Sequence, residues 1–187
     1  ISMSILAFNI QPVKSTWTGT VYIRADGSID PPDAPIITYD NVTYTLTDNI
    51  TSTANGIIVE RDNIVIDGAG YTLEGTGSGY GVCLDGRSNV TIKSTTITNF
   101  NLGIRLYGCS NNIISGNNIT NNGCGIWGYS SNNIISGNNI AANNDCGIGL
   151  HYSSNNSISG NNIAANDEFG IWLSYPSNNN SICGNNI

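Results

Sequence analysis

The sequence predicts an all-β fold, a single-stranded parallel β-helix (a solenoid) of about six coils with an N-terminal cap. The string SNNIISGNNI occurs at residues 110–119 and again at 131–140, with close copies at 154–163 and 178–187. Gly followed by Ile or Val also recurs every 22 to 25 residues, and two further isoleucine positions recur with similar steps. Three short apolar segments per period, separated by Ser, Gly and Asn turns, indicate a coil of three strands.

Three segments follow one another along the chain. Residues 1–19 open with an apolar run, which we expect to be either the remnant of a secretory signal or a donated strand. Residues 20–62 contain three of the five prolines and are predicted to form the N-terminal cap and the first coil. Residues 63–187 hold the repeats and are predicted to form one domain with the cap.

Composition argues against other folds and excludes several partners. Leucine-rich repeats share this period, but they need several leucines per repeat. The net charge is −7 and no Lys or Arg follows Arg105, whereas binding to nucleic-acid phosphates needs clustered cations. No apolar stretch is long enough for a transmembrane segment. The five cysteines lack CxxC spacing and the chain has one His and one Met, so we predict no metal site and no cofactor.

The alternation of side chains across a strand predicts which residues face the core. In GIRLY (103–107), Ile104 and Leu106 face inward, while Arg105 and Tyr107 face outward. Asn112 lies two residues before an inward Ile and is therefore also inward. The same column holds Asn133, Asn156 and Asn180. A buried amide is costly unless paired, so we expect a ladder between these copies, with the other asparagines at turns.

The segment NIVIDGAGYTLEG (63–75), the SNNIISGNNI units and the GIRLY and GIWLS strands resemble the NosD-like, carbohydrate-binding and sugar-hydrolase (CASH) group of β-helix repeats, as in exported archaeal surface proteins. The resemblance covers roughly residues 20–187 and implies a right-handed β-helix. It leaves the activity open, because such solenoids host lyases, hydrolases, adhesins and structural proteins. The copper-related role attached to the NosD name is not carried over, because the His and Met residues it would use are missing.

One outward strand face carries large aromatic residues. Trp127 and Trp172 lie two coils apart, roughly 10 Å, and Gly149 is expected to leave a gap between them. The same face holds Arg105, Tyr107, Tyr129 and His151. Flat rings along a groove would bind carbohydrate, whereas the alternative is that they pack on each other, on a loop or on a neighbouring subunit.

Two carboxylates form a second, weaker candidate site. Asp145 and Glu168 each precede a position predicted to be inward, so we expect them to be outward neighbours one coil apart. Carboxylates about 5 Å apart suit a retaining glycosidase or a cation site. An enzyme of this kind would be a glycoside hydrolase or a polysaccharide lyase. The alternative is an exposed turn with solubilising acids, and no basic residue lies in this half of the chain to assist a reaction.

Cysteines and glycosylation signals complete the candidate positions. Cys124 and Cys146 share a column, with Leu102 and Phe169, that is predicted to face inward. Adjacent coils bring their Cα atoms within reach of a disulfide, and two buried thiols are the alternative. N-x-S/T triplets, which would be glycosylated in an exported protein, begin at Asn41, Asn49, Asn89, Asn118, Asn155 and Asn179.

The repeats predict a strand edge after GNNI (184–187) without a recognisable cap. An open edge invites pairing, so we expect either a fragment or a head-to-tail homopolymer of the chain. The residues expected to take part in assembly are Ile1, Ile5, Leu6, Phe8, Ile10, Ile182 and Ile187. The predicted function is therefore that of a non-catalytic, extracellular or cell-surface structural protein that forms a fibre. The alternative is a carbohydrate-binding or carbohydrate-cleaving module.

Overall fold

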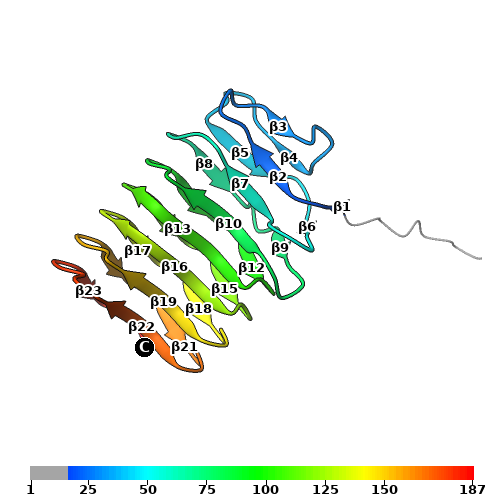
Figure 1. Ribbon diagram of the computed structural model, residues 1–187. Helices are drawn as coiled ribbons and strands as arrows, with labels where there is room; N and C mark the ends of the chain where they lie inside the picture. Colours follow the sequence, from blue (N-terminus) through cyan, green and yellow to red (C-terminus); the bar gives the residue numbers. More distant parts are fainter. Residues whose placement is uncertain (1–16) are drawn as a thin grey trace, which may run out of the picture.

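A computed structural model describes residues 17–187, and in this part of the chain every regular element is a β-strand. The strands form three sheets that run along one axis (Figure 1). Sheet A consists, in order, of β1 (Trp17–Thr18), β6 (Ile50–Thr51), β9 (Thr72–Glu74), β12 (Thr96–Thr98), β15 (Asn118–Thr120), β18 (Asn139–Ala141) and β21 (Asn162–Ala164).

The other two sheets contain eight strands each. Sheet B consists, in order, of β3 (Ile29–Asp30), β2 (Val21–Ile23), β7 (Ile57–Val59), β10 (Tyr80–Asp85), β13 (Leu102–Ser110), β16 (Cys124–Ser131), β19 (Cys146–His151) and β22 (Phe169–Ser174). Sheet C consists, in order, of β4 (Ile36–Ile37), β5 (Thr43–Leu46), β8 (Val65–Asp67), β11 (Thr91–Lys93), β14 (Ile113–Ser115), β17 (Ile134–Ser136), β20 (Ser157–Ser159) and β23 (Ser181–Cys183).

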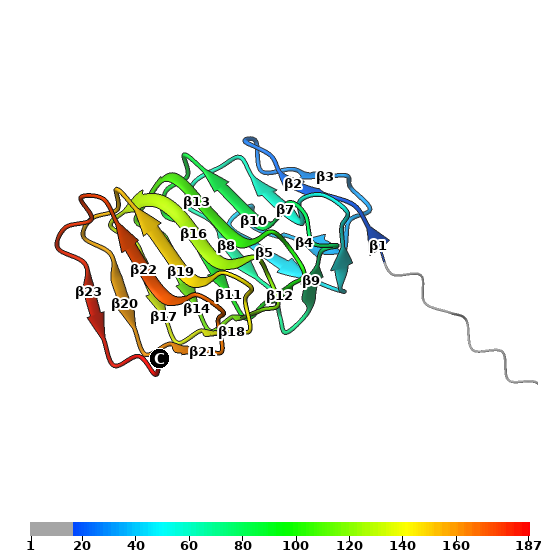
Figure 2. The same ribbon diagram turned by 60° about the horizontal axis from the view of Figure 1, so that its bottom comes forward.

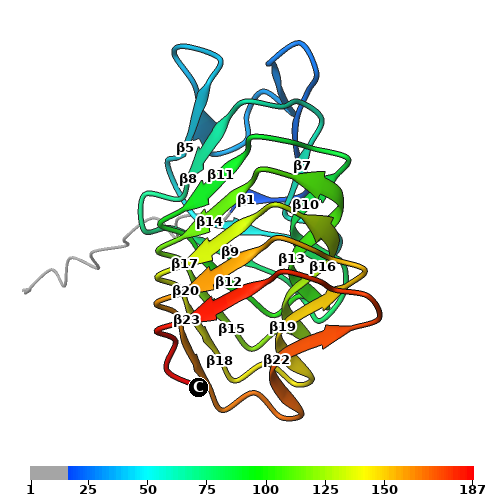
Figure 3. The same cartoon turned by 90° about the vertical axis from the view of Figure 1, so that its left-hand side faces the viewer.

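Each coil passes through sheet B, then sheet C, then sheet A, and returns to sheet B one level further along the axis (Figure 3). Six successive coils start at β7, β10, β13, β16, β19 and β22. The predicted columns exist, since Ile114 pairs in parallel register with Ile135, and Ile135 with Ile158, and all three are fully buried. The predicted all-β parallel β-helix of about six coils is therefore confirmed.

The N-terminal end is covered by an insertion in the first turn of the solenoid. Parallel pairing already begins at β1 with β6 and at β2 with β7. Between β2 and β5 the chain turns back, so that β3 and β4 pair antiparallel with their neighbours and lie at the end of the stack (Figure 2). The buried Tyr44 hydroxyl donates a 2.8 Å hydrogen bond to the carbonyl of Gly27 and ties this insertion to sheet C. Residues 1–16, with Ile1, Ile5, Leu6, Phe8 and Ile10, lie outside the described residues.

A glycine column forms the corner at which each coil enters sheet B. A Cβ on Gly103 would lie 2.5 Å from the carbonyl oxygen of Gly125, and a Cβ on Gly125 would lie 2.6 Å from that of Gly147. The same Cβ atoms would lie 2.7 and 2.8 Å from isoleucine Cγ2 atoms of sheet A. No side chain fits there, which explains why Gly precedes Ile in each period. Gly103 and Ile104 both face inward, so the strict alternation of side chains fails at this corner.

Three ladders of buried asparagine amides run along the core. The predicted one, through Asn112, Asn133, Asn156 and Asn180, is confirmed. Two more run through Asn117, Asn138, Asn161 and Asn185, and through Asn122, Asn143 and Asn166. These asparagines lie in the connections between strands, as predicted, but their side chains are buried in the core, and the turn positions with positive φ are held by others such as Asn111, Asn121 and Asn132. Each Nδ2 donates to the Oδ1 one coil further at 2.8 to 3.2 Å.

The side chain of Asn138 shows how fully such an amide is bonded. Its Oδ1 accepts from both the backbone N–H and the Nδ2 of Asn117, each at 3.0 Å. Its own Nδ2 donates to Asn161 Oδ1 and to the carbonyl of Ile114, each at 2.9 Å. Every buried polar atom of the amide therefore has a partner, which removes the usual cost of burying it.

We predict that Asn138→Ala lowers the free energy of unfolding by about 3 kcal/mol, because the backbone N–H and side chain of Asn117 lose their acceptor in a dry core. Urea denaturation of both chains measures the difference. The control is Asn139→Ala, its neighbour on the outer surface, whose half-buried amide donates to Asn118 Oδ1 and whose loss water can compensate. The control should lose less than about 1 kcal/mol, and equal losses in the two variants would contradict a special role for the buried ladder.

Candidate functional site

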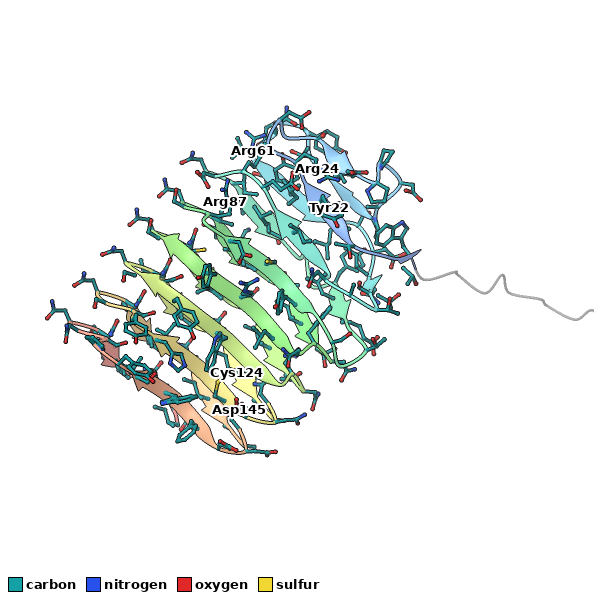
Figure 4. The ribbon with its side chains drawn as sticks, viewed as in Figure 1. Tyr22, Arg24, Arg61, Arg87, Cys124 and Asp145 are labelled. Atoms are coloured by element: carbon teal, nitrogen blue, oxygen red, sulfur yellow. A yellow bond between two sulfur atoms is a disulfide. The ribbon has the colours of Figure 1, made fainter. Side chains whose placement is uncertain are left out.

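The outer face of sheet B changes in chemistry along the axis. Register places Cys83, Arg105, Trp127, Gly149 and Trp172 in one outward column. Toward the N-terminal end this face carries ion pairs such as Arg105 with Asp85, whose Nη1 and Oδ2 are 3.0 Å apart. Arg24, Arg61 and Arg87 all belong to this end of the molecule (Figure 4). From Trp127 onward the face is aromatic.

The two tryptophans pack against each other. Their ring centroids are 5.6 Å apart, with the rings at 63° in an edge-to-face arrangement. The gap predicted above Gly149 is absent, because the ring of Trp127 lies across this glycine, with Cε3 2.4 Å from the position that a Cβ would occupy. The alternative that the rings pack on each other is therefore what the structure shows. Such pairs add about 0.5–1.5 kcal/mol beyond the area that they bury.

His151 lies at the centre of the aromatic cluster. Its ring centroid is 4.2 Å from that of Trp127 and 4.7 Å from that of Trp172, and only 5% of the residue is exposed. Nδ1 is hydrogen-bonded to the hydroxyl of Ser174, while Nε2 has no partner among the described residues. Burial lowers the pKa of His151, since an imidazolium would lose its hydration in this position.

Three tyrosines form a stack beside this cluster. The rings of Tyr152 and Tyr175 are 4.8 Å apart and nearly parallel, and Tyr129 stacks on Tyr152 at 6.4 Å. Tyr107 meets Tyr129 edge-on at 5.7 Å. Sequence reasoning missed Tyr152 and Tyr175, although each directly follows an outward strand residue in adjacent coils. Stacking covers one face of the Tyr175 ring, and this residue is still 70% exposed at the end of the stack.

Cys124 and Cys146 form a disulfide between adjacent coils. The prediction that their column faces inward is wrong, because the glycine corner reverses the alternation. Cys146 Sγ lies 3.1 Å from the outward Cβ position of Gly149, and Phe169, in the same column, is 42% exposed and stacks on Trp172. Closing a loop of this length stabilises a fold by about 3 kcal/mol in the chain-entropy account.

The other three cysteines are free. Cys83 and Cys109 are buried and Cys183 is exposed. Burial raises the pKa of the Cys83 thiol to about 11.

A groove runs over the corner between sheets A and B. One hollow of about 520 Å³ is lined by Gly75, Thr76, Gly77, Asn99, Phe100, Asn101, Asn121, Gly123 and Asn144. A second of about 210 Å³ is lined by Asn101, Leu102, Gly123, Cys124, Trp127 and Asp145. The two share Asn101 and Gly123, so they are continuous, and we call them together the Trp127 groove. Figure 4 shows Cys124 and Asp145 close together near the starts of β16 and β19.

The bottom of this groove is made of backbone. A Cβ on Gly123 would lie 2.4 Å from the carbonyl oxygen of Asn101, so this position accepts only glycine without a shift of the chain. The hollow therefore follows from the close stacking of the coils. Amide side chains and the Trp127 ring form its walls.

The structure brings the predicted carboxylates to adjacent coils, as expected. The backbone N–H of Glu168 donates to the carbonyl of Asp145 at 2.9 Å. Asp145 is half-buried and lines the Trp127 groove, whereas Glu168 is exposed and is not among the lining residues.

No group of three or more His, Cys, Asp or Glu within residues 17–187 is placed to hold a metal ion. In the same part of the chain no helix is long and apolar enough to cross a membrane.

Two further sets of predicted residues are placed by the structure. Of the glycosylation signals, Asn118 is half-buried in an outward ladder. The exposed ones are Asn41, Asn49, Asn89, Asn155 and Asn179. Ile182 and Ile187, predicted to take part in assembly, are 44% and 70% exposed on the last coil.

Comparison with known proteins gives one match. The family model described as the right handed beta helix region matches residues 55–187, which is more than half of the chain. No curated protein and no solved structure matches the chain significantly.

We predict that stability falls as the pH drops through the ordinary histidine pKa of about 6.5. The pKa of His151 is lower in the folded chain, so the unfolded chain takes up the proton first, and acid favours unfolding. His151 is the one histidine in the sequence, which makes the assignment direct. Urea midpoints at pH 7.5 and 5.5 measure the effect. In His151→Phe the two midpoints should agree, and a pH dependence that survives this substitution would contradict the assignment.

Proposed function

The chain belongs to the right-handed β-helix family, and from this premise we propose that it is a non-catalytic, exported, carbohydrate-binding scaffold. The observation that supports this proposal is the Trp127 groove, whose two adjoining hollows are lined by amide side chains, glycines and an indole ring. Amides both donate and accept hydrogen bonds, as sugar hydroxyls require, and an aromatic ring contacts the apolar face of a sugar.

The shape of the groove suits an extended polymer. Its lining runs from Gly75 to Asp145 over four successive coils. Coils stack at about 4.8 Å, so the groove is long enough for several sugar units along the axis. Its walls are mainly neutral, which favours hydroxyl recognition over the binding of an anion.

The composition of the groove supports binding without catalysis. Asp145 is the only lining residue that bears a carboxylate, and Cys124 is held in a disulfide. Glycoside hydrolysis by the usual routes needs two carboxylates on either side of the bond. The disulfide supports export, because such bonds persist in oxidising compartments.

We predict that Trp127→Ala weakens binding to neutral oligosaccharides by about tenfold or more, because the ring contact is lost. A glycan array identifies a ligand, and calorimetric titration gives the dissociation constants. Tyr39→Ala removes an aromatic residue that is 94% exposed on the cap and should leave the affinity unchanged. Trp172→Ala should have a smaller effect than Trp127→Ala, because Trp172 does not line the groove. Binding that survives Trp127→Ala would rule out this groove.

A different observation favours end-to-end self-association as a second function. The last described coil exposes residues whose counterparts are buried one coil earlier, as Ile182 does at 44% against 0% for Ile158. The strands β22 and β23, each paired on one side only, and the ends of the three asparagine ladders lie on the same edge. We propose that a second copy covers this edge, head to tail. The head-to-tail contact would be made by the cap of the second copy, whose short antiparallel strands β3 and β4 lie beside Pro31, Pro32 and Pro35, and not by a long continuation of the sheets.

We predict that the 187-residue chain self-associates and that Ile182→Lys, which places a charge on the core side of the last coil, returns it to a monomer. Sedimentation and electron microscopy distinguish the products, since head-to-tail contact gives filaments and a two-fold contact between the open edges gives a discrete dimer. Ser181→Lys, on the outward side of the same strand, should leave the assembly intact. A wild-type chain that stays monomeric at high concentration would refute self-association.

A further inference from the structure

The Asp145 carboxylate in the Trp127 groove has no cationic partner among residues 17–187. Asp145, Asp167 and Glu168 are the only acids after Arg105, and no Lys or Arg accompanies them in the sequence. The nearest preceding cations are paired with acids of earlier coils. Arg105 contacts Asp85 at 3.0 Å, and Lys93 contacts Asp67 at 2.6 Å. The groove therefore has unneutralised negative charge at one end.

Asp145 and the ring of Trp127 line the same hollow of about 210 Å³. A carboxylate attracts a cation through its charge, and an indole face attracts it through its quadrupole, so both act on one bound group. A neutral hydroxyl can donate a hydrogen bond to the carboxylate, but only a cation also gains the attraction between full charges, and an anionic sugar would be repelled. This end of the groove thus selects for positive charge.

The backbone around Asp145 is fixed before any ligand arrives. Its N–H donates to the carbonyl of Gly123 at 2.8 Å, and its own carbonyl accepts from Glu168 at 2.9 Å and Phe169 at 3.1 Å. The disulfide joins the next residue, Cys146, to Cys124 in the coil below. A site held in this way loses little freedom on binding.

We propose that the Trp127 end of the groove binds a primary ammonium group carried by the carbohydrate ligand, which makes the ligand a polymer containing amino sugars. This inference rests on the proposed carbohydrate binding and adds the chemical class of the ligand. The ammonium lies between the Asp145 carboxylate and the Trp127 ring, while neutral parts of the chain occupy the amide-lined hollow.

The test compares three oligomers of equal length, of glucosamine, N-acetylglucosamine and glucose, by calorimetric titration. Acetylation removes the positive charge and keeps the sugar ring, so it isolates the ammonium. The glucosamine oligomer should bind about three- to tenfold more tightly than the other two, as expected for one cation–π contact and one partly exposed ion pair. Added salt should reduce this advantage, because it screens the carboxylate.

Two variants separate this inference from the function on which it rests. Asp145→Asn should abolish the preference for glucosamine, so that the three oligomers bind this variant with equal affinity. The control Asp33→Asn, an exposed acid on the cap, should keep the preference. Equal binding of all three oligomers, lost in Trp127→Ala, would overturn the ammonium site and keep carbohydrate binding. Failure of every oligomer to bind would overturn both, and a lysine oligomer that alone binds through Asp145 would overturn the sugar ligand.

Discussion

The structure depends on one constraint, which is that a polar group inside the solenoid must find its partner in the next coil. An amide such as Asn133 has no water to bond, and its neighbours within the coil are mostly apolar. An identical amide directly above and another directly below satisfy it together with the carbonyl of Ser131. This arrangement is possible only when successive coils keep the same register. The ladders therefore fix the alignment of the strands, which isoleucine columns alone would specify less sharply.

The same register determines what the outer surface can do. Whatever stands at an outward position is placed about 4.8 Å from its counterpart in the next coil. Aromatic residues at neighbouring outward positions consequently pack into a cluster around His151, and two cysteines in one column come close enough to form a disulfide. Gly123, which lies outside the glycine column, lines the hollow without adding a side chain to it. The repeat therefore aligns the positions that form the candidate site. Because their side chains lie outside the core, core packing does not restrict which residues occupy them.

The sequence was informative wherever a simple period determines the contact. The columns through Ile114 and Asn112 follow directly from spacing, and both are present. The ladders through Asn117 and Asn122 were missed, although Asn117 also lies two residues before a buried Ile. The cysteine column was assigned to the wrong side, because two consecutive residues, Gly103 and Ile104, both face inward at the corner. The closure of the gap above Gly149 depends on the side-chain conformation of Trp127, which no spacing encodes.

The position of the groove, and not the size of the aromatic cluster, decides which ring is suited to binding. Within the cluster Tyr152 and Tyr175 stack on each other, and His151 and Trp172 pack against Trp127. Breaking such contacts to admit a sugar would cost the stacking that holds them. Trp127 alone combines membership of the cluster with a place in the groove wall. Its neighbours therefore hold its orientation, while its groove side remains available to a ligand, which is the arrangement expected of a preorganised binding residue.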